Sequence, residues 1–150
     1  MSWSTLFGIA NLAALIAWAM LILLPSRARL IPVLRFGGVG ALCLLYAGLV
    51  VMALSGGFGR SDGPAPDFST IPGVRAIFAT DGGVVTGWLH YLALDLFAGV
   101  WIAEDADRRG FPRWGQASVL LVTFLAGPAG LLIWFAIRAV GQNQRGTAAL

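Results

Sequence analysis

The chain has 150 residues, of which 58% are hydrophobic and only 11% are charged, with a mean hydropathy of +0.81 and a net charge of +3. An ordinary soluble domain carries roughly 25% charged residues, and a body this small cannot hide so much apolar surface in its own interior. The composition therefore excludes a disordered chain, argues against a soluble globular domain, and predicts an integral membrane protein.

Four apolar stretches are long enough to cross a hydrocarbon core about 30 Å thick, which takes about 20 helical residues. They cover residues 3–24, 32–55, 86–103 and 116–140. Backbone groups in lipid must be satisfied locally, and these stretches lack the alternation of barrel strands. The sequence thus predicts an all-α, integral membrane four-helix bundle that forms a single domain over residues 1–150. The first stretch is interpreted as a retained helix because its arginines follow it, whereas those of a signal peptide would precede it.

A short helix is expected in the connection between the second and third stretches. Ser69 or Thr70 is a suitable helix cap, with Pro72 in the first turn. Four apolar side chains then share one face of that helix, which predicts a position at the membrane interface. These side chains are Ile71, Val74, Ile77 and Phe78.

The distribution of arginines predicts an orientation. The turns after the first and third stretches together hold six arginines, namely Arg27, Arg29, Arg35, Arg108, Arg109 and Arg113. The opposite side holds four, namely Arg60, Arg75, Arg138 and Arg145. Because cytoplasmic loops carry the excess of positive residues, both turns are expected inside and both termini in the periplasm.

Several classes of site and partner are not expected. Cys43 is the one cysteine and His90 the one histidine, so the chain offers no disulfide framework and no metal site of several such ligands. No basic run is interleaved with aromatic residues, so the arginines are expected to face anionic membrane lipids and not nucleic acid.

The residues most able to carry chemistry lie in the third stretch. Ionisable groups near the centre of a membrane helix cost about 3 kcal/mol or more, which makes His90 and Asp95 candidates for function. At 100° per residue, Asp95 lies on the face of Tyr91 and about 140° away from His90. The two groups can line one pocket only if they flank it or if the fourth helix bridges between them.

Structural roles are alternatives for the same residues. Asp95 would then accept hydrogen bonds from Tyr91 and from a neighbouring helix, and His90 would belong to an aromatic belt at the interface. Glu104 either joins local ion pairs in a solvated turn or reaches back into a pocket at headgroup level. Asn11 is suited to a hydrogen bond between helices.

The fourth stretch contains a helix breaker and small residues. Pro128 is expected to kink the helix because it lacks a backbone donor. Gly127 and Gly130 permit the close approach of a flat ligand or, as an alternative, of another helix.

Two segments of the chain carry a recognisable pattern. The first segment contributes Trp88, His90, Asp95, Leu96, Phe97, Ala98, Trp101 and Asp105. The second contributes Thr123, Phe124, Gly127, Pro128, Gly130 and Leu131. Together they resemble the neoxanthin synthase family, the abscisic-acid-deficient-four-like family of small four-helix membrane proteins. In plants this family is linked to making neoxanthin from violaxanthin, so the resemblance implies a carotenoid or other isoprenoid substrate. The lysine-free, arginine-rich composition indicates a bacterial member in the cell inner membrane.

The resemblance implies an isomerisation in which an epoxide opens and a neighbouring carbon loses a proton to give an allene. That reaction needs an acid and a base but no redox cofactor. We expect Asp95 as the acid and His90 as the base, or the two roles exchanged, with Glu104 as a reserve acid. The residues expected to bind substrate are Trp88, Tyr91, Phe97, Trp101, Thr123, Gly127, Pro128 and Trp134.

A non-catalytic role is the competing hypothesis. The protein would then bind a carotenoid or lipid, or assemble a pigment-processing or light-harvesting complex, as a homo-oligomer or with other proteins. In an enzyme, Asp95 and His90 should face one apolar cleft, whereas in a scaffold both should pair with neighbouring helices. Transport is disfavoured because the expected spans hold too few polar residues.

Overall fold

The computed structural model describes residues 2–24, 27–59 and 65–147, and these residues form helices joined by turns, with no strand among them. The all-α class is therefore confirmed. In chain order the elements are α1 (Trp3–Leu23), α2 (Arg27–Pro32), the π-helical segment η1 (Val33–Val39), α3 (Gly40–Leu54), α4 (Ile71–Ile77), α5 (Asp81–Arg108), α6 (Arg113–Leu125) and α7 (Gly127–Thr147).

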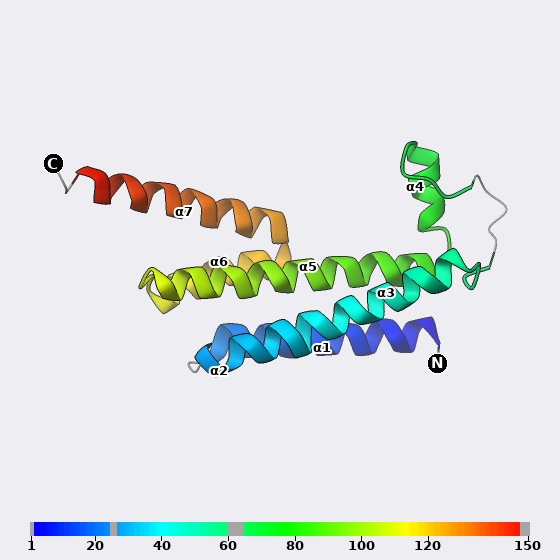
Figure 1. The fold of residues 1–150 in the computed structure, drawn as a ribbon, viewed down its shortest axis with the longest axis horizontal. Helices are drawn as coiled ribbons and strands as arrows, with labels where there is room; N and C mark the ends of the chain where they lie inside the picture. The colour runs from blue at the N-terminus through cyan, green and yellow to red at the C-terminus, as the bar shows by residue number, and fades with distance from the viewer. Residues whose placement is uncertain (1, 25–26, 60–64, 148–150) are drawn as a thin grey trace.

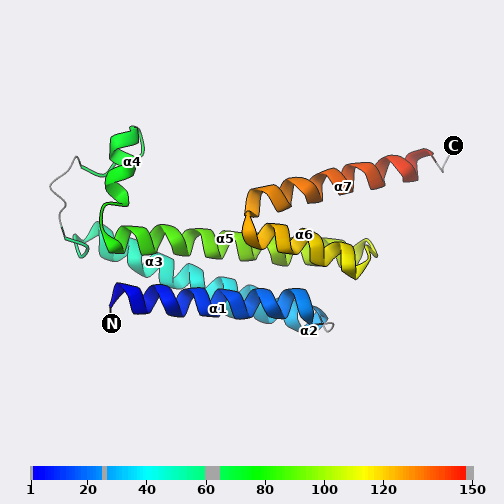
Figure 2. The same ribbon diagram turned by 180° about the vertical axis from the view of Figure 1, so that it is seen from behind.

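Within the described part of the chain, three helical stretches are long and apolar enough to cross a membrane: Trp3–Leu23, Arg29–Leu54 and Asp81–Arg108. They lie side by side with their axes roughly aligned (Figure 1). α5 is the central helix because it packs against α1, α3 and α6. Figure 2 shows the same arrangement from behind.

The core is a narrow seam between these helices. α1 turns small residues toward it (Ala10, Ala14 and Ala17), and the indole of Trp18 lies against the backbone of Gly99 on α5. The opposite face of α1 leaves large apolar side chains such as Leu12 more than half exposed. Apolar residues that face outward over the length of a helix are what a lipid-facing surface requires.

The fourth expected crossing is not a continuous helix. α6 ends at Leu125, the chain reverses at Ala126, and α7 runs back beside α6 toward the end where α5 finishes (Figures 1 and 2). With 13 residues, α6 is only about 20 Å long and too short for a hydrocarbon core of about 30 Å. The structure therefore has three long helices and a helical hairpin where the sequence predicted a four-helix bundle.

The reversal also changes where the ends of the chain lie. α1 begins at one end of the molecule, and α7 finishes at the other (Figure 1). The sequence predicts both termini on one side because residues 116–140 are expected to form a fourth crossing. With only the three long helices running between the two ends of the described part of the molecule, the start of α1 and the end of α7 lie at opposite ends.

The short helix between the second and third long helices is present as α4. Thr70 is its cap, with the hydroxyl accepting a hydrogen bond from Gly73 N at 3.0 Å, and Pro72 lies in the first turn as expected. The ring of Phe78 packs against Gly87, at the start of α5. α4 therefore stands beside the start of α5, roughly perpendicular to the long helices and to one side of them (Figure 1).

Candidate functional site

Asp95 lies in the middle of α5, where the hairpin makes its turn. Its side chain is half-buried, and its carboxylate lies so close to the backbone of Gly127 that a Cβ atom at position 127 would overlap it. Among the described residues, this carboxylate has no hydrogen-bond or ion-pair partner. Asp95 is thus an acidic group placed at a helix junction in the apolar part of the molecule.

The junction is built by residues with little or no side chain. Ala126 has φ −154° and ψ 79°, so its backbone is outside the helical region and ends α6. Pro128 is in the first turn of α7, where its missing N–H would have no helical partner in any case. Gly130 lies against Thr123, whose Cα a Cβ atom at position 130 would overlap. Of the two alternatives for Gly127 and Gly130, the structure shows the close approach of other helices, with α5 and α6 as the neighbours, and the approach of a flat ligand stays a prediction.

The carboxylate of Asp95 also faces the start of α7. The first backbone N–H groups of a helix have no partner within it and carry a partial positive charge. At this terminus Ala129 N and Gly130 N both donate to Ala126 O, which closes the first turn. The start of α7 therefore offers Asp95 the partial positive charge of a helix terminus, but no hydrogen bond from these two groups.

His90 points to a different neighbour. Its exposed ring lies 5.5 Å from the ring of Tyr46 on α3 and 6.2 Å from that of Tyr91, measured between ring centroids. Asp95 faces the α6–α7 junction. The structure does not bring these two groups together, in agreement with their angular separation along one helix.

Glu104 and Asp105 belong to an ion-pair cluster at the end of α5. Arg35 of η1 donates to Glu104 Oε2 at 2.6 Å. Asp105 Oδ2 accepts from Arg109 Nε at 2.9 Å and lies 3.3 Å from Arg138 Nε of α7. We call these five residues the α5-end cluster.

The α5-end cluster includes partners that sequence reasoning missed. The sequence predicted a solvated turn with local ion pairs, and the local pair between Asp105 and Arg109 is present. Arg35 is 69 positions from its partner, Glu104, so no local spacing reveals that contact. Glu104 is engaged by Arg35 and is directed at the end of the bundle, away from Asp95.

The aromatic residues expected to bind substrate divide into two groups. Some hold helices together: Trp88 Nε1 donates to Asn11 Oδ1 at 3.0 Å, which confirms the expected interhelical role of Asn11. Trp134 is 1% exposed, and its Nε1 donates to Asp105 at 3.1 Å. Trp101 stacks edge-on with Phe135 of α7, at 5.9 Å between ring centroids.

The second group is exposed on α5. Tyr91 is 60% exposed and lies one turn before Asp95, on the same face of the helix. Phe97 is 50% exposed, but it lies about 160° away from Asp95, on the face of His90. Thr123, expected in the same site, is fully buried and donates to Val119 O at 2.8 Å. An apolar molecule would thus meet Tyr91 from the lipid side, beside the half-exposed Asp95.

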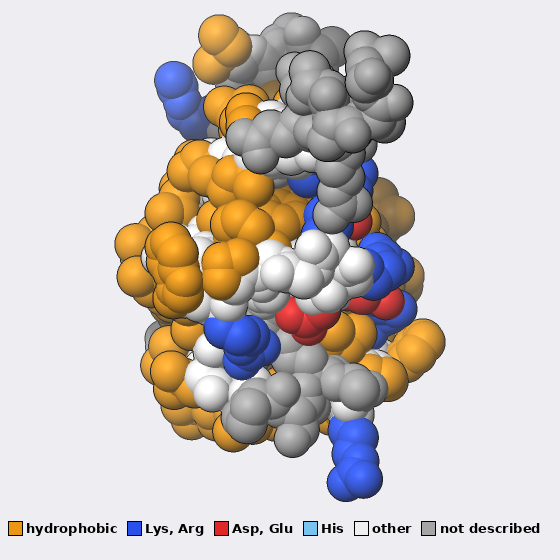
Figure 3. All heavy atoms as spheres, turned by 90° about the vertical axis from the view of Figure 1, so that its left-hand side faces the viewer, with side chains coloured by type: hydrophobic (Ala, Val, Ile, Leu, Met, Phe, Trp, Pro, Cys, Tyr) orange, Lys and Arg blue, Asp and Glu red, His pale blue; other side chains and the backbone are white. Residues whose placement is uncertain are grey.

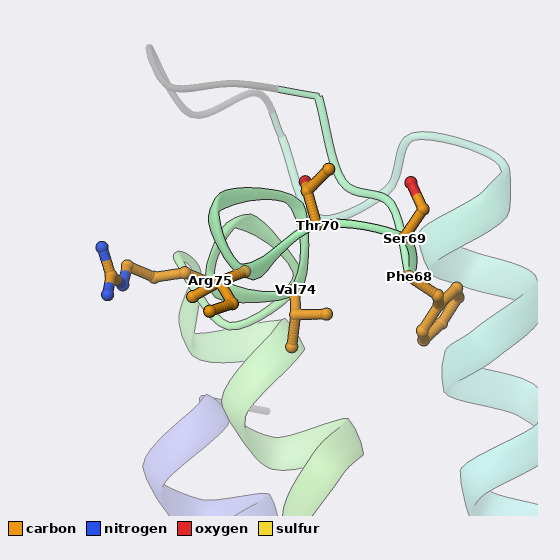
Figure 4. A pocket seen from close by; sticks show the side chains of 6 residues that line it. Phe68, Ser69, Thr70, Val74 and Arg75 are labelled. Carbon is orange, nitrogen blue, oxygen red and sulfur yellow. The ribbon is translucent and has the colours of Figure 1, made fainter.

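A metal site or a pocket elsewhere among the described residues could also bind a ligand. No group of three or more His, Cys, Asp or Glu side chains is placed to hold a metal ion. A shallow, open hollow lies beside α4, as Figure 4 shows, and none of the candidate site residues lines it. It is lined by Phe68, Ser69, Thr70, Ile71, Val74 and Arg75.

The sequence matches a known protein family over most of its length. A family model described as ABA DEFICIENT 4-like matches residues 5–134. The chain belongs to this family. The match confirms the resemblance drawn from the two motifs and extends it into the first half of the chain. No curated protein and no solved structure matches the chain.

Proposed function

We propose that this member of the ABA DEFICIENT 4-like family is a membrane protein that isomerises a carotenoid or similar isoprenoid, with Asp95 as the proton donor. The observation that carries the proposal is the position of Asp95. Its carboxylate has no partner among the described residues, and it lies against Gly127 at the start of α7, on the same face of α5 as the exposed ring of Tyr91. An unpaired carboxyl group in an apolar region is costly and is by default a functional group.

The proposed reaction moves protons and leaves the composition of the substrate unchanged. Asp95 protonates the oxygen of a carotenoid epoxide, and the carbon–oxygen bond breaks. A neighbouring carbon then loses a proton, which leaves an allene beside the new hydroxyl group. Protons balance because one is gained at oxygen and one is lost from carbon, so no redox cofactor is needed.

The same carboxyl group is the best candidate for both proton transfers. Once Asp95 has given up its proton, it is a carboxylate that can accept the proton from carbon. His90, the base expected from the sequence, faces α3 and would have to change neighbours to reach a substrate beside Asp95. Glu104 would first have to leave Arg35. The arrangement therefore favours a mechanism with one carboxyl group.

Pigment analysis in cells tests this proposal. The chain is expressed in a bacterium engineered to make epoxy-carotenoids, and the extracted pigments are separated by chromatography. We expect a new carotenoid with the wild-type chain and its loss, by at least about a hundredfold, with Asp95→Asn. The matched control is Asp81→Asn, because Asp81 is exposed in the first turn of α5. Unchanged conversion by Asp95→Asn contradicts the proposal.

Non-catalytic pigment binding is the second candidate. It is favoured by the engagement of the next acidic side chains along α5, since Glu104 and Asp105 are both held in the α5-end cluster, away from Asp95. Under this alternative, the pigment profile does not change, and a carotenoid purifies with the protein. Asp95→Asn would then alter the absorption spectrum or the amount of bound pigment without removing any product.

A further inference from the structure

One end of the molecule collects most of the arginines. This end, where α5 finishes and α6 begins, also receives the end of α1, the segment α2–η1 and the end of α7 (Figure 1). The arginines on these elements whose side chains the structure describes are Arg29, Arg35, Arg108, Arg109, Arg113 and Arg138. Figure 3 looks onto this end and shows blue side chains around a few red ones. We call it the arginine-rich end.

Acidic residues neutralise only part of this charge. Among the described side chains, three acidic residues lie here, namely Glu104, Asp105 and Asp107, against six arginines. The first two are engaged by Arg35, Arg109 and Arg138. Arg29 and Arg108 remain exposed at the rim, and Arg108 is no closer than 3.9 Å to either acid. The arginine-rich end therefore presents an excess of positive charge to whatever lies beyond it.

The opposite end has the reverse balance among the described residues. It holds one arginine, Arg75, and two acidic residues, Asp67 and Asp81. The contrast between the ends depends on the hairpin. If residues 116–140 crossed as one helix, Arg138 would lie at this opposite end, whereas the structure pairs it with Asp105.

We propose that the arginine-rich end docks on the anionic phospholipid headgroups of the cytoplasmic leaflet. Phosphate groups complement the excess of arginine, and cytoplasmic segments of membrane proteins are enriched in positive residues. The start of α1 then lies on the outer side, and the end of α7 lies in the cytoplasm. This differs from the orientation that the sequence alone predicts, in which both termini are outside. The inference holds whether or not the protein acts on carotenoids.

Labelling of single cysteines tests the orientation. In a Cys43→Ala background, Ser2→Cys and Thr147→Cys place one thiol near each terminus. A membrane-impermeant maleimide added to intact bacterial cells should label Ser2→Cys and leave Thr147→Cys unlabelled, whereas both should react after the cells are permeabilised. Labelling of Thr147→Cys in intact cells, alone or together with Ser2→Cys, would overturn the proposal.

Lipid binding by the purified protein tests the docking surface itself. Phosphatidylglycerol and phosphatidylcholine are added in equal amounts, and the lipids retained are counted by native mass spectrometry. The double variant Arg29→Gln/Arg108→Gln should retain at least twofold less phosphatidylglycerol than wild type, with phosphatidylcholine unchanged. Arg75→Gln, an exposed arginine at the other end, is the matched control. Equal retention by the double variant and the control would contradict docking on anionic lipid.

Discussion

Gly127 is the residue on which the position of Asp95 depends most directly. A methyl group at this position would overlap the Asp95 carboxylate. Gly127→Ala should therefore push the carboxyl group away from the start of α7 and reduce conversion of the pigment roughly tenfold to a hundredfold, as misplacement of a reacting group does.

The matched control for Gly127→Ala is Gly141→Ala, in the same helix. A methyl group at position 141 would meet no atom within 4 Å. Chromatography of the pigments made by the two variants compares them directly. Equal conversion by Gly127→Ala and Gly141→Ala would mean that the contact between Gly127 and Asp95 has no part in the reaction.

Asp67 allows a prediction about pH outside the membrane-spanning helices. Its carboxylate accepts hydrogen bonds from the side chain and backbone of Ser69 and from Thr70, and these bonds lower its pKa below the ordinary value near 3.8. Because the pKa is lowered by folding, this turn is stabilised above about pH 3.8, and the stabilisation is lost as the pH falls through the lower pKa. Titration of the carboxyl carbon by NMR should show a midpoint below 3.8. A midpoint at or above that value would contradict the structure of this turn.

Residue-level predictions from sequence succeeded where partners are near in the chain or where a residue type has one strong preference. Thr70 as a cap is one case, and Gly127 as a point of close approach is another. The pairs of Arg35 with Glu104 and of Arg138 with Asp105 were out of reach. Their partners come together only through the tertiary arrangement.

At the scale of the element, the packing of α1 on α5 depends on Gly99. The Trp18 ring occupies the space that a side chain at position 99 would need. Gly99→Ala should destabilise the protein by about 1–3 kcal/mol, because overpacking in a close-packed seam forces side chains or helices apart. The free energy of unfolding in a detergent titration measures this loss.

Gly8→Ala is the matched control for this experiment. Gly8 is exposed on α1, and a methyl group there would meet no atom within 4 Å. Since alanine favours helix more than glycine by about 1 kcal/mol, Gly8→Ala should be neutral or slightly stabilising. If both variants unfold like wild type, the seam between Trp18 and Gly99 is not tightly packed.

The extent of each element followed the apolar runs only in part. The first stretch, 3–24, corresponds closely to α1 (Trp3–Leu23). The third, 86–103, identifies only the apolar middle of α5 (Asp81–Arg108), because the ends of this helix are polar and are defined by capping and turns. The length of an apolar run indicates how much of a helix lipid can cover. The helix itself continues beyond the run wherever its backbone groups still form hydrogen bonds.

At the scale of the whole molecule, the arrangement of the helices differs most from what the sequence predicts. The composition, the helical class and the family were all predictable, because each depends on residue types and short motifs. The hairpin was not, because an apolar run with Pro128 inside it is compatible with a kinked crossing as well as with a reversal. The non-helical backbone at Ala126 decides between them. Because the chain reverses at this residue, the molecule has one crossing fewer than the sequence predicts, and Arg138 lies at the end where α5 finishes.

The reversal at Ala126 is thus the claim on which the site, the orientation and the proposed function all depend. It is tested by spin labels at Trp114 and Val140, two exposed positions near the start of α6 and in the second half of α7, in a Cys43→Ala background. A continuous helix would hold these positions about 39 Å apart, at 1.5 Å per residue. The hairpin predicts a distance distribution centred well below that value. A distribution centred near 39 Å would show a straight crossing and contradict the placement of Asp95 against Gly127.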